Sequence, residues 1–170
     1  MKNVVFATAM IASLAACAPM PRSNPLSRAQ ADGLAIGAIE VVTTGAAFES
    51  ARAGDYASAL DPDLTAALER EFADRRAPNG ANLLVDIARL NVADSGRTAF
   101  GWDQSKLIGQ ARLTTADGAV IATYPVQVTA GEAAKTRTGA LIDTAIASST
   151  NYYQDLVVTF AEDLRELIEQ

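Results

Sequence analysis

The feature that most constrains the fold of this sequence is a pair of alternating stretches at residues 106–115 and 119–129. In each, apolar side chains fall mainly on positions of one parity, the period of a β-strand with one buried face. Asp117 and Gly118 between them are typical of a tight hairpin turn. The two stretches therefore predict an antiparallel β-hairpin. Pro125 has no amide hydrogen, so we expect its strand to lie at a sheet edge, or its amide position to face away from a partner strand.

Two other stretches, 34–42 and 83–92, are rich in β-branched and aliphatic residues and predict further strands. The apolar positions of the second stretch change parity between Ile87 and Leu90. This change indicates a β-bulge near residues 88–89, or a strand that is partly covered on both faces.

The first helix is predicted over residues 62–76. Asp61, Pro62 and Asp63 supply an N-cap residue, a proline suited to the first helical position and an acid in the first turn. Apolar residues follow at helical spacing. The preceding residues, 43–60, predict an irregular connection.

The last segment predicts a second main helix. Asn151 and Gln154 resemble a capping box, and an apolar stripe continues for about four turns. We expect this helix to lie across the sheet, because a small antiparallel sheet needs a cover for its apolar face. A helix that binds a partner is the alternative.

The element order is therefore strand, helix, strand, strand, strand, helix. It predicts a single α+β domain over residues 34–170, with a mostly antiparallel sheet of about four strands and the two main helices on one face.

The N-terminal segment, residues 1–16, has the layout of a secretory signal peptide. A lysine is followed by an apolar run at residues 4–14, which is too short to span a bilayer as a helix. Residues 17–33 contain three prolines among polar residues and predict a flexible tether.

The end of the signal segment, Leu14-Ala15-Ala16-Cys17, resembles the lipobox of bacterial lipoproteins, in which a leucine, two small residues and a cysteine stand together. The resemblance implies that the Cys17 thiol receives a diacylglyceryl group, that the preceding residues are removed, and that the new amino group is acylated. Ala18, rather than an aspartate, follows the cysteine, which by resemblance to enteric lipoproteins implies the outer membrane, facing the periplasm. An ordinary signal peptide with a chance cysteine is the alternative.

The charge balance is acidic, with 14 basic and 20 acidic residues and no basic cluster larger than Arg75-Arg76. We therefore expect no nucleic-acid partner and attachment to the membrane through the lipid.

The sequence has no histidine, and its single cysteine is Cys17. The lack of histidine excludes histidine acid–base chemistry, and with Cys17 lipidated we also expect no zinc site of the Cys/His type and no free thiol nucleophile. We expect no catalytic residue, no metal and no cofactor.

Two sets of side chains could still carry chemistry or contacts. Asp61 and Asp63 could be paired carboxylates, but their place at a helix start explains them. Phe100 and Trp102 lie in a polar loop at residues 94–105 and are the candidate contact residues. The alternative is that the two rings fold back over the end of the sheet.

The lipobox, the tether and the order of elements together resemble the YajG-type and PqiC-type envelope lipoproteins, and lipoprotein subunits that assist transport or secretion across the bacterial envelope. The resemblance implies a non-catalytic binding or accessory subunit of an envelope transport or assembly complex, with an envelope protein as partner. The alternatives are a self-assembling structural or pore component and, less favoured, a carboxylate-based periplasmic hydrolase.

Overall fold

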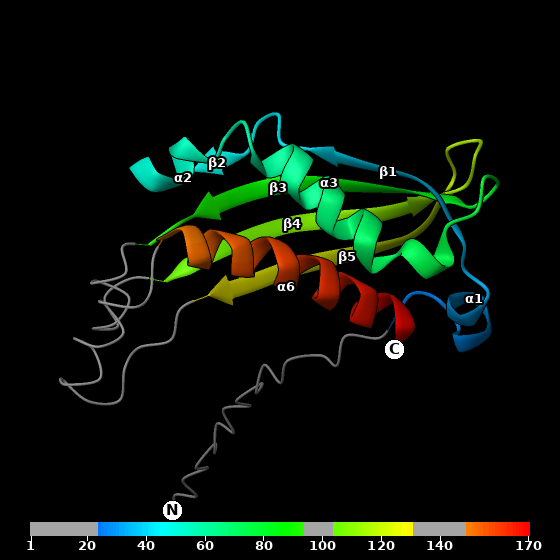
Figure 1. Ribbon diagram of the computed structural model, residues 1–170. Coiled ribbons are helices and arrows are strands. Elements are labelled where there is room, and N and C mark those ends of the chain that lie inside the picture. The colour runs from blue at the N-terminus through cyan, green and yellow to red at the C-terminus, as the bar shows by residue number, and fades with distance from the viewer. Residues whose placement is uncertain (1–23, 94–103, 131–148) are drawn as a thin grey trace, which may run out of the picture.

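The computed structural model describes residues 24–93, 104–130 and 149–170, which form a sheet with helices against one face (Figure 1). The elements in chain order are α1 (Arg28–Asp32), β1 (Ile36–Val42), β2 (Ala47–Phe48), α2 (Ala51–Asp55), α3 (Leu60–Glu71), the 3-10 turn η1 (Ala73–Arg75), β3 (Ala81–Asn91), β4 (Ser105–Thr114), β5 (Val120–Ala130) and α6 (Ser149–Glu169).

The sheet confirms the predicted α+β class. Its strand order is β1-β3-β4-β5, with the short β2 also paired to β3. The three long strands β3, β4 and β5 are antiparallel neighbours, whereas β1 and β2 run parallel to β3. Helices α3 and α6 both lie against the same face, α3 beside β1 and α6 beside β4 and β5 (Figure 1). The segment predicted to be irregular contains β2 and α2.

The predicted hairpin is the β4–β5 pair. Gly118 in its turn has φ +86°, a left-handed conformation that glycine adopts without steric cost. β5 ends the strand order, so the edge position expected from Pro125, which lies opposite Gln110, is confirmed.

The change of parity in β3 is a β-bulge, as one of the two sequence interpretations expects. The register between β3 and β4 shifts between Ile87 and Arg89. Because of this shift, Val85, Ile87 and Leu90 are all buried on the helix-covered face.

The core lies between the sheet and the two long helices. Its largest fully buried side chains come from both layers: Phe72, Phe160, Ile36, Leu60, Leu64, Leu68, Leu83, Leu90, Leu107, Leu113, Leu156 and Leu164. The apolar stripe of α6 thus covers the sheet, as the sequence predicts for this helix.

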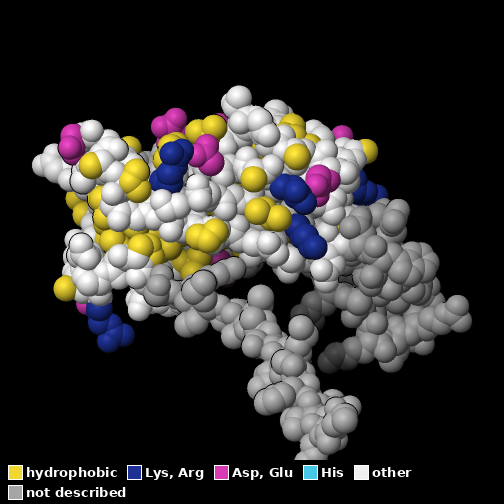
Figure 2. All heavy atoms as spheres, turned by 180° about the vertical axis from the view of Figure 1, so that it is seen from behind, with side chains coloured by type: hydrophobic (Ala, Val, Ile, Leu, Met, Phe, Trp, Pro, Cys, Tyr) yellow, Lys and Arg dark blue, Asp and Glu magenta, His cyan; other side chains and the backbone are white. Residues whose placement is uncertain are grey.

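None of the described helices covers the opposite face of the sheet, which mixes apolar, polar and charged side chains (Figure 2). On it, Arg112 forms an ion pair with Asp86 at 2.5 Å. Leu84 and Ile108, on neighbouring strands, are half-buried.

Both predicted helix starts are displaced. α3 begins at Leu60 with Ala59 as an N-cap that makes no side-chain hydrogen bond, so the predicted N-cap role of Asp61 is wrong. Asp61 and Asp63 instead lie in the first turn, where a carboxylate interacts favourably with the helix dipole. α6 includes Ser149, so Asn151 lies inside the helix and is not its N-cap.

The predicted tether extends too far into the domain. Residues 28–32 form the helix α1, and Leu26 and Ala31 are 5% and 1% exposed. The prolines and polar residues of 17–33 suggested a tether, but Leu26 and Ala31 in this stretch pack onto the domain. The part of the chain that packs on the domain includes Asn24.

Candidate functional site

The residues to which the sequence assigns a role lie outside the described residues and stay predictions. They are Leu14, Ala15, Ala16, Cys17, Phe100 and Trp102. The structure shows instead where the segments that carry them join the domain. The N-terminal segment enters beside the C-terminal end of α6, whereas β3 leaves and β4 enters at the opposite end of the sheet (Figure 1).

Asn24 fixes the point where the N-terminal segment enters. Its Nδ2 donates to the backbone carbonyl of Ile168 at 2.9 Å. Its Oδ1 accepts from the Leu26 amide at 2.9 Å and from the Tyr124 hydroxyl at 2.8 Å. Burial raises the pKa of Tyr124 to about 12, so this hydroxyl remains a donor at neutral pH. One amide side chain thus joins the entering chain to β5 and to the end of α6.

α1 follows Asn24, and its N-terminus is capped by a reciprocal capping box. The Ser27 side chain accepts from the Gln30 backbone amide, and the Gln30 side chain accepts from the Ser27 amide at 3.0 Å. Such a box satisfies amide groups that a helix start otherwise leaves free. A helix of five residues is not stable alone, so α1 depends on its contacts with the domain.

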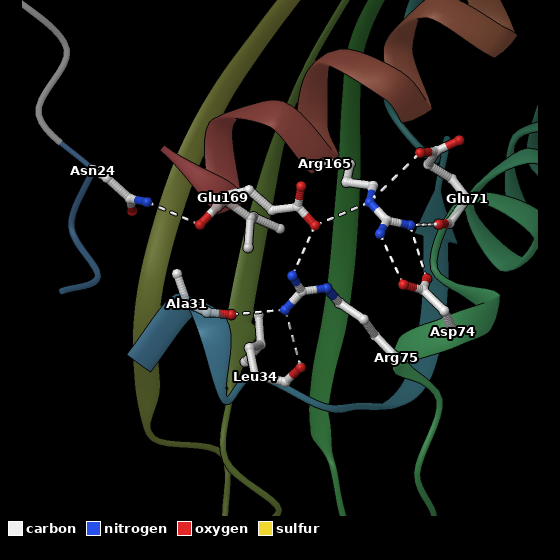
Figure 3. A network of polar contacts seen from close by, with 9 residues as sticks. Asn24, Ala31, Leu34, Glu71, Asp74, Arg75, Arg165 and Glu169 are labelled. Atoms are coloured by element: carbon white, nitrogen blue, oxygen red, sulfur yellow. Dashed lines mark hydrogen bonds and ion pairs between the residues drawn. The ribbon is translucent and has the colours of Figure 1, made fainter. Parts of the chain in front are cut away.

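Arg75 supplies such a contact from η1 (Figure 3). Its guanidinium donates to the carbonyl of Ala31 at 2.7 Å and to that of Leu34 at 3.5 Å. It also pairs with Glu169 at 2.8 Å. The Arg75 side chain is only 18% exposed, so it connects α1 to the last turn of α6 in a partly dry environment.

Arg165 extends the same network to the end of α3 (Figure 3). It makes two hydrogen bonds to the Asp74 carboxylate, at 2.8 and 2.9 Å, and one to Glu169 at 3.0 Å. It also donates to the backbone carbonyl of Glu71. The hydrogen bond from Arg165 holds the pKa of the Asp74 carboxyl below its usual value. We call Asn24, Arg75, Arg165 and Glu169 the entry clamp.

A second feature is a groove between the outer sides of α3 and α6. It begins in a hollow of about 480 Å3, whose lining residues are Tyr56, Ala59, Asp63, Ala66, Arg70, Tyr153, Gln154, Val157 and Val158. A smaller hollow of about 150 Å3 continues it, and the two share Arg70 and Val158. We call these two hollows together the helical groove.

Two tyrosines lie side by side in the lining of the helical groove. The rings of Tyr56 and Tyr153 stack with centroids 3.9 Å apart and an interplanar angle of 7°. The Tyr153 hydroxyl donates to Asp63 at 2.8 Å. Burial, together with Asp63, raises the pKa of Tyr153 above its ordinary value, so the hydroxyl stays protonated. This part of the lining is therefore held together by ring stacking and by the hydrogen bond from Tyr153 to Asp63.

The two acids considered as paired carboxylates each have a local partner. Asp63 accepts from Tyr153, and Asp61 accepts from the hydroxyl of Thr65, one turn later in α3, at 3.3 Å. Among the described residues, no group of three or more His, Cys, Asp or Glu side chains is placed to hold a metal ion.

Charge is unequally divided between the two layers. α3 carries four acidic residues and one arginine, and α6 carries five acidic residues and one arginine. The strands of the sheet together carry two acidic and three basic residues. Almost all of the excess negative charge of the described domain therefore lies on the two helices that border the helical groove.

Sequence reasoning missed the helical groove. The visible signal was Val158, which lies outside the apolar stripe of α6 and is 41% exposed. No signal connected Tyr56 with Tyr153, because they are far apart in sequence and Tyr56 lies in a segment predicted to be irregular.

No protein-family model and no curated protein matches the chain. Among solved structures, the chain is similar to a candidate lipoprotein of Caulobacter crescentus CB15, at 15% identity, with 83% of this chain and 92% of that chain covered and a TM-score of 0.41. It is also similar to a PelC dodecamer from Paraburkholderia phytofirmans, at 12% identity, with 80% and 88% covered and a TM-score of 0.41. Similarity at this level concerns the outline of the fold and assigns no family.

Within the described ranges, no helix is long and apolar enough to cross a membrane.

Proposed function

We propose that this protein is a bacterial envelope lipoprotein, anchored through Cys17, that acts by binding a partner. The observation that carries the proposal is the entry clamp. Seven residue steps separate Cys17 from Asn24 in the sequence, and each spans at most about 3.6 Å, so the lipid-bearing residue reaches about 25 Å from the domain. A domain held this close to a bilayer meets partners at the membrane surface.

The site of action is the outer membrane, on its periplasmic side. This part of the proposal rests on Ala18, which follows the lipobox cysteine. The role is that of an accessory subunit in an envelope transport or assembly complex, as the resemblance of the lipobox, tether and element order implies.

Binding, rather than catalysis, is supported by the partners of the acids. Asp63 accepts a hydrogen bond from the Tyr153 hydroxyl, and Asp61 accepts one from the Thr65 hydroxyl. Both hydrogen bonds stabilise the fold. A carboxylate that accepts such a hydrogen bond holds a neighbouring side chain in place, which supports a binding role for the groove.

The proposal is tested by labelling cells with radioactive palmitate. The native chain should incorporate the label, and Cys17→Ser should abolish it and release the protein from the membrane fraction. Ser13→Ala, in the same segment, should label normally. Continued labelling of Cys17→Ser refutes the anchor. Ala18→Asp should leave labelling intact while moving the protein to the inner membrane; an unchanged distribution refutes the sorting part alone.

A further inference from the structure

The helical groove has the shape of a site for another helix. It lies between two packed helices, and its lining includes the small residues Ala66 of α3 and Ala59, the N-cap of that helix. Small side chains along one wall leave room for the larger side chains of a third helix, because helices pack with the ridges of one in the grooves of the next.

An exposed apolar side chain lies in the middle of the groove. Val158 is 41% exposed and lines both hollows, together with Ala66 in one and Ala161 in the other. The other large apolar side chain that is exposed among the described residues is Val120, 61% exposed at the start of β5. Val158 therefore lies in a hollow, where a partner side chain can bury it.

The borders of the groove are acidic. Asp63 lies at one end, and Glu71 and Glu162 lie at the other. The one basic side chain of the lining, Arg70, is directed back along its own helix and donates to the Ala66 carbonyl at 3.3 Å. Glu71 is paired with Arg165 at 3.7 Å, which leaves Asp63 and Glu162 to face a partner. The acids of the lining outnumber its one arginine, so the groove favours a cationic partner.

We propose that the helical groove binds a basic amphipathic helix of an envelope protein. The apolar side of that helix covers Val158 and the alanines, and its Lys and Arg side chains face Asp63 and Glu162. This is the helix-in-groove mode, in which apolar anchors recur at intervals of three and four residues. The inference rests on the proposed function, because that function supplies a partner at the membrane surface.

The cysteine content of the chain allows a direct test of occupancy. The sequence has one cysteine, Cys17, so after its acylation a cysteine introduced at Val158 or Val120 is the only free thiol. Val158→Cys is the probe and Val120→Cys the matched control, since both positions are exposed. The rate of reaction with a charged maleimide is measured in isolated envelopes of the native bacterium and in the purified acylated protein, with the unsubstituted chain as background.

In envelopes we expect Val158→Cys to react about tenfold more slowly than in the purified protein, as for a site that is about 90% occupied. Val120→Cys should react equally in both. Raising the salt to about 0.5 M should restore the rate at Val158→Cys, because salt screens the attraction between exposed charges. Equal rates for Val158→Cys in envelopes and in the purified protein refute the inference.

The chemistry of the occupant is tested on the purified protein with two synthetic helices. One has Leu and Lys at helical spacing, and the other has Glu in place of Lys. The Leu/Lys peptide should slow the reaction at Val158→Cys and not at Val120→Cys, and the Leu/Glu peptide should have no effect. If Val158→Cys is protected in envelopes, but salt does not relieve the protection and the Leu/Lys peptide does not reproduce it, a basic helix as occupant is refuted. Failure of the lipid anchor would appear separately, as reaction of the unsubstituted chain at Cys17.

Discussion

The side-chain Nδ2 of Asn24 donates to the backbone carbonyl of Ile168 at 2.9 Å, across 144 residues of sequence. This contact joins the first described residue to the last turn of the last helix. It makes the point where the chain enters the domain part of the packed structure. In the proposed lipoprotein, the distance from the domain to the lipid is then set by the few residues between Cys17 and Asn24.

Replacement of Asn24 by alanine should destabilise the domain by about 1–3 kcal/mol, because it leaves the Ile168 carbonyl, the Leu26 amide and the Tyr124 hydroxyl without their partner. Urea unfolding of the purified protein measures the change. Asn79→Ala, at an exposed turn position, is the matched control and should change the stability by less than about 0.5 kcal/mol. Equal stability of the native chain and Asn24→Ala contradicts the role of the clamp.

Replacement of Arg75 by alanine should loosen α1 while the sheet stays folded. The substitution removes the donor to the Ala31 and Leu34 carbonyls and the pair with Glu169. Hydrogen exchange of the amides in residues 28–34 should become faster, with protection in β3 and β4 unchanged. The neighbouring Arg76→Ala, an exposed side chain, should leave exchange as it is. Uniform acceleration throughout the domain would instead show that Arg75 supports the whole fold.

Gly109→Ala should destabilise the domain by about 1–3 kcal/mol through overpacking. An added Cβ would lie 2.8 Å from the Asp86 carbonyl oxygen and 3.2 Å from the ring of Phe160, where α6 approaches the sheet. Gly54→Ala in α2 meets no atom within 4 Å and should be neutral or stabilising by up to about 1 kcal/mol. Thermal unfolding of the two variants compares them, and a stable Gly109→Ala would mean that α6 can move away from β4.

Alkaline pH should weaken the fold through Tyr124. Its pKa is about 12 in the folded protein against 10.0 ordinarily, because burial disfavours the phenolate. The unfolded chain therefore loses the proton first, and the stabilisation, complete below pH 10, is lost as the pH rises towards 12. The free energy of unfolding should fall by about 2 kcal/mol more in the native chain than in Tyr124→Phe over this range. Parallel curves for the two proteins contradict the assignment.

The elements with a strong local pattern were predictable. The β4–β5 hairpin followed from parity and the Asp117-Gly118 turn, the β3 bulge from the change of parity at Ile87, and the edge position of β5 from Pro125. The alternation of apolar and polar residues within a short stretch indicates which face of a strand is buried. The parallel pairing of β1 with β3 was not predictable, because strand direction depends on the connection between them.

The clamp and the groove depend on contacts that no local pattern records. The prolines near Asn24 predicted a tether, whereas a capping box and the buried side chains Leu26 and Ala31 hold this part of the chain on the domain. The helical groove needs Tyr56 beside Tyr153, two residues that are brought together only by the packing of α6. In both cases tertiary packing decided the structure of a segment whose composition suggested a loop.

The most direct test of the lipoprotein account is the intact mass of the protein extracted from membranes. The account predicts a chain that begins at Cys17 and carries a diacylglyceryl group and an amide-linked acyl chain, with Leu14, Ala15 and Ala16 absent. A chain that retains Met1, or one that begins at another residue with an unmodified Cys17 thiol, would contradict it.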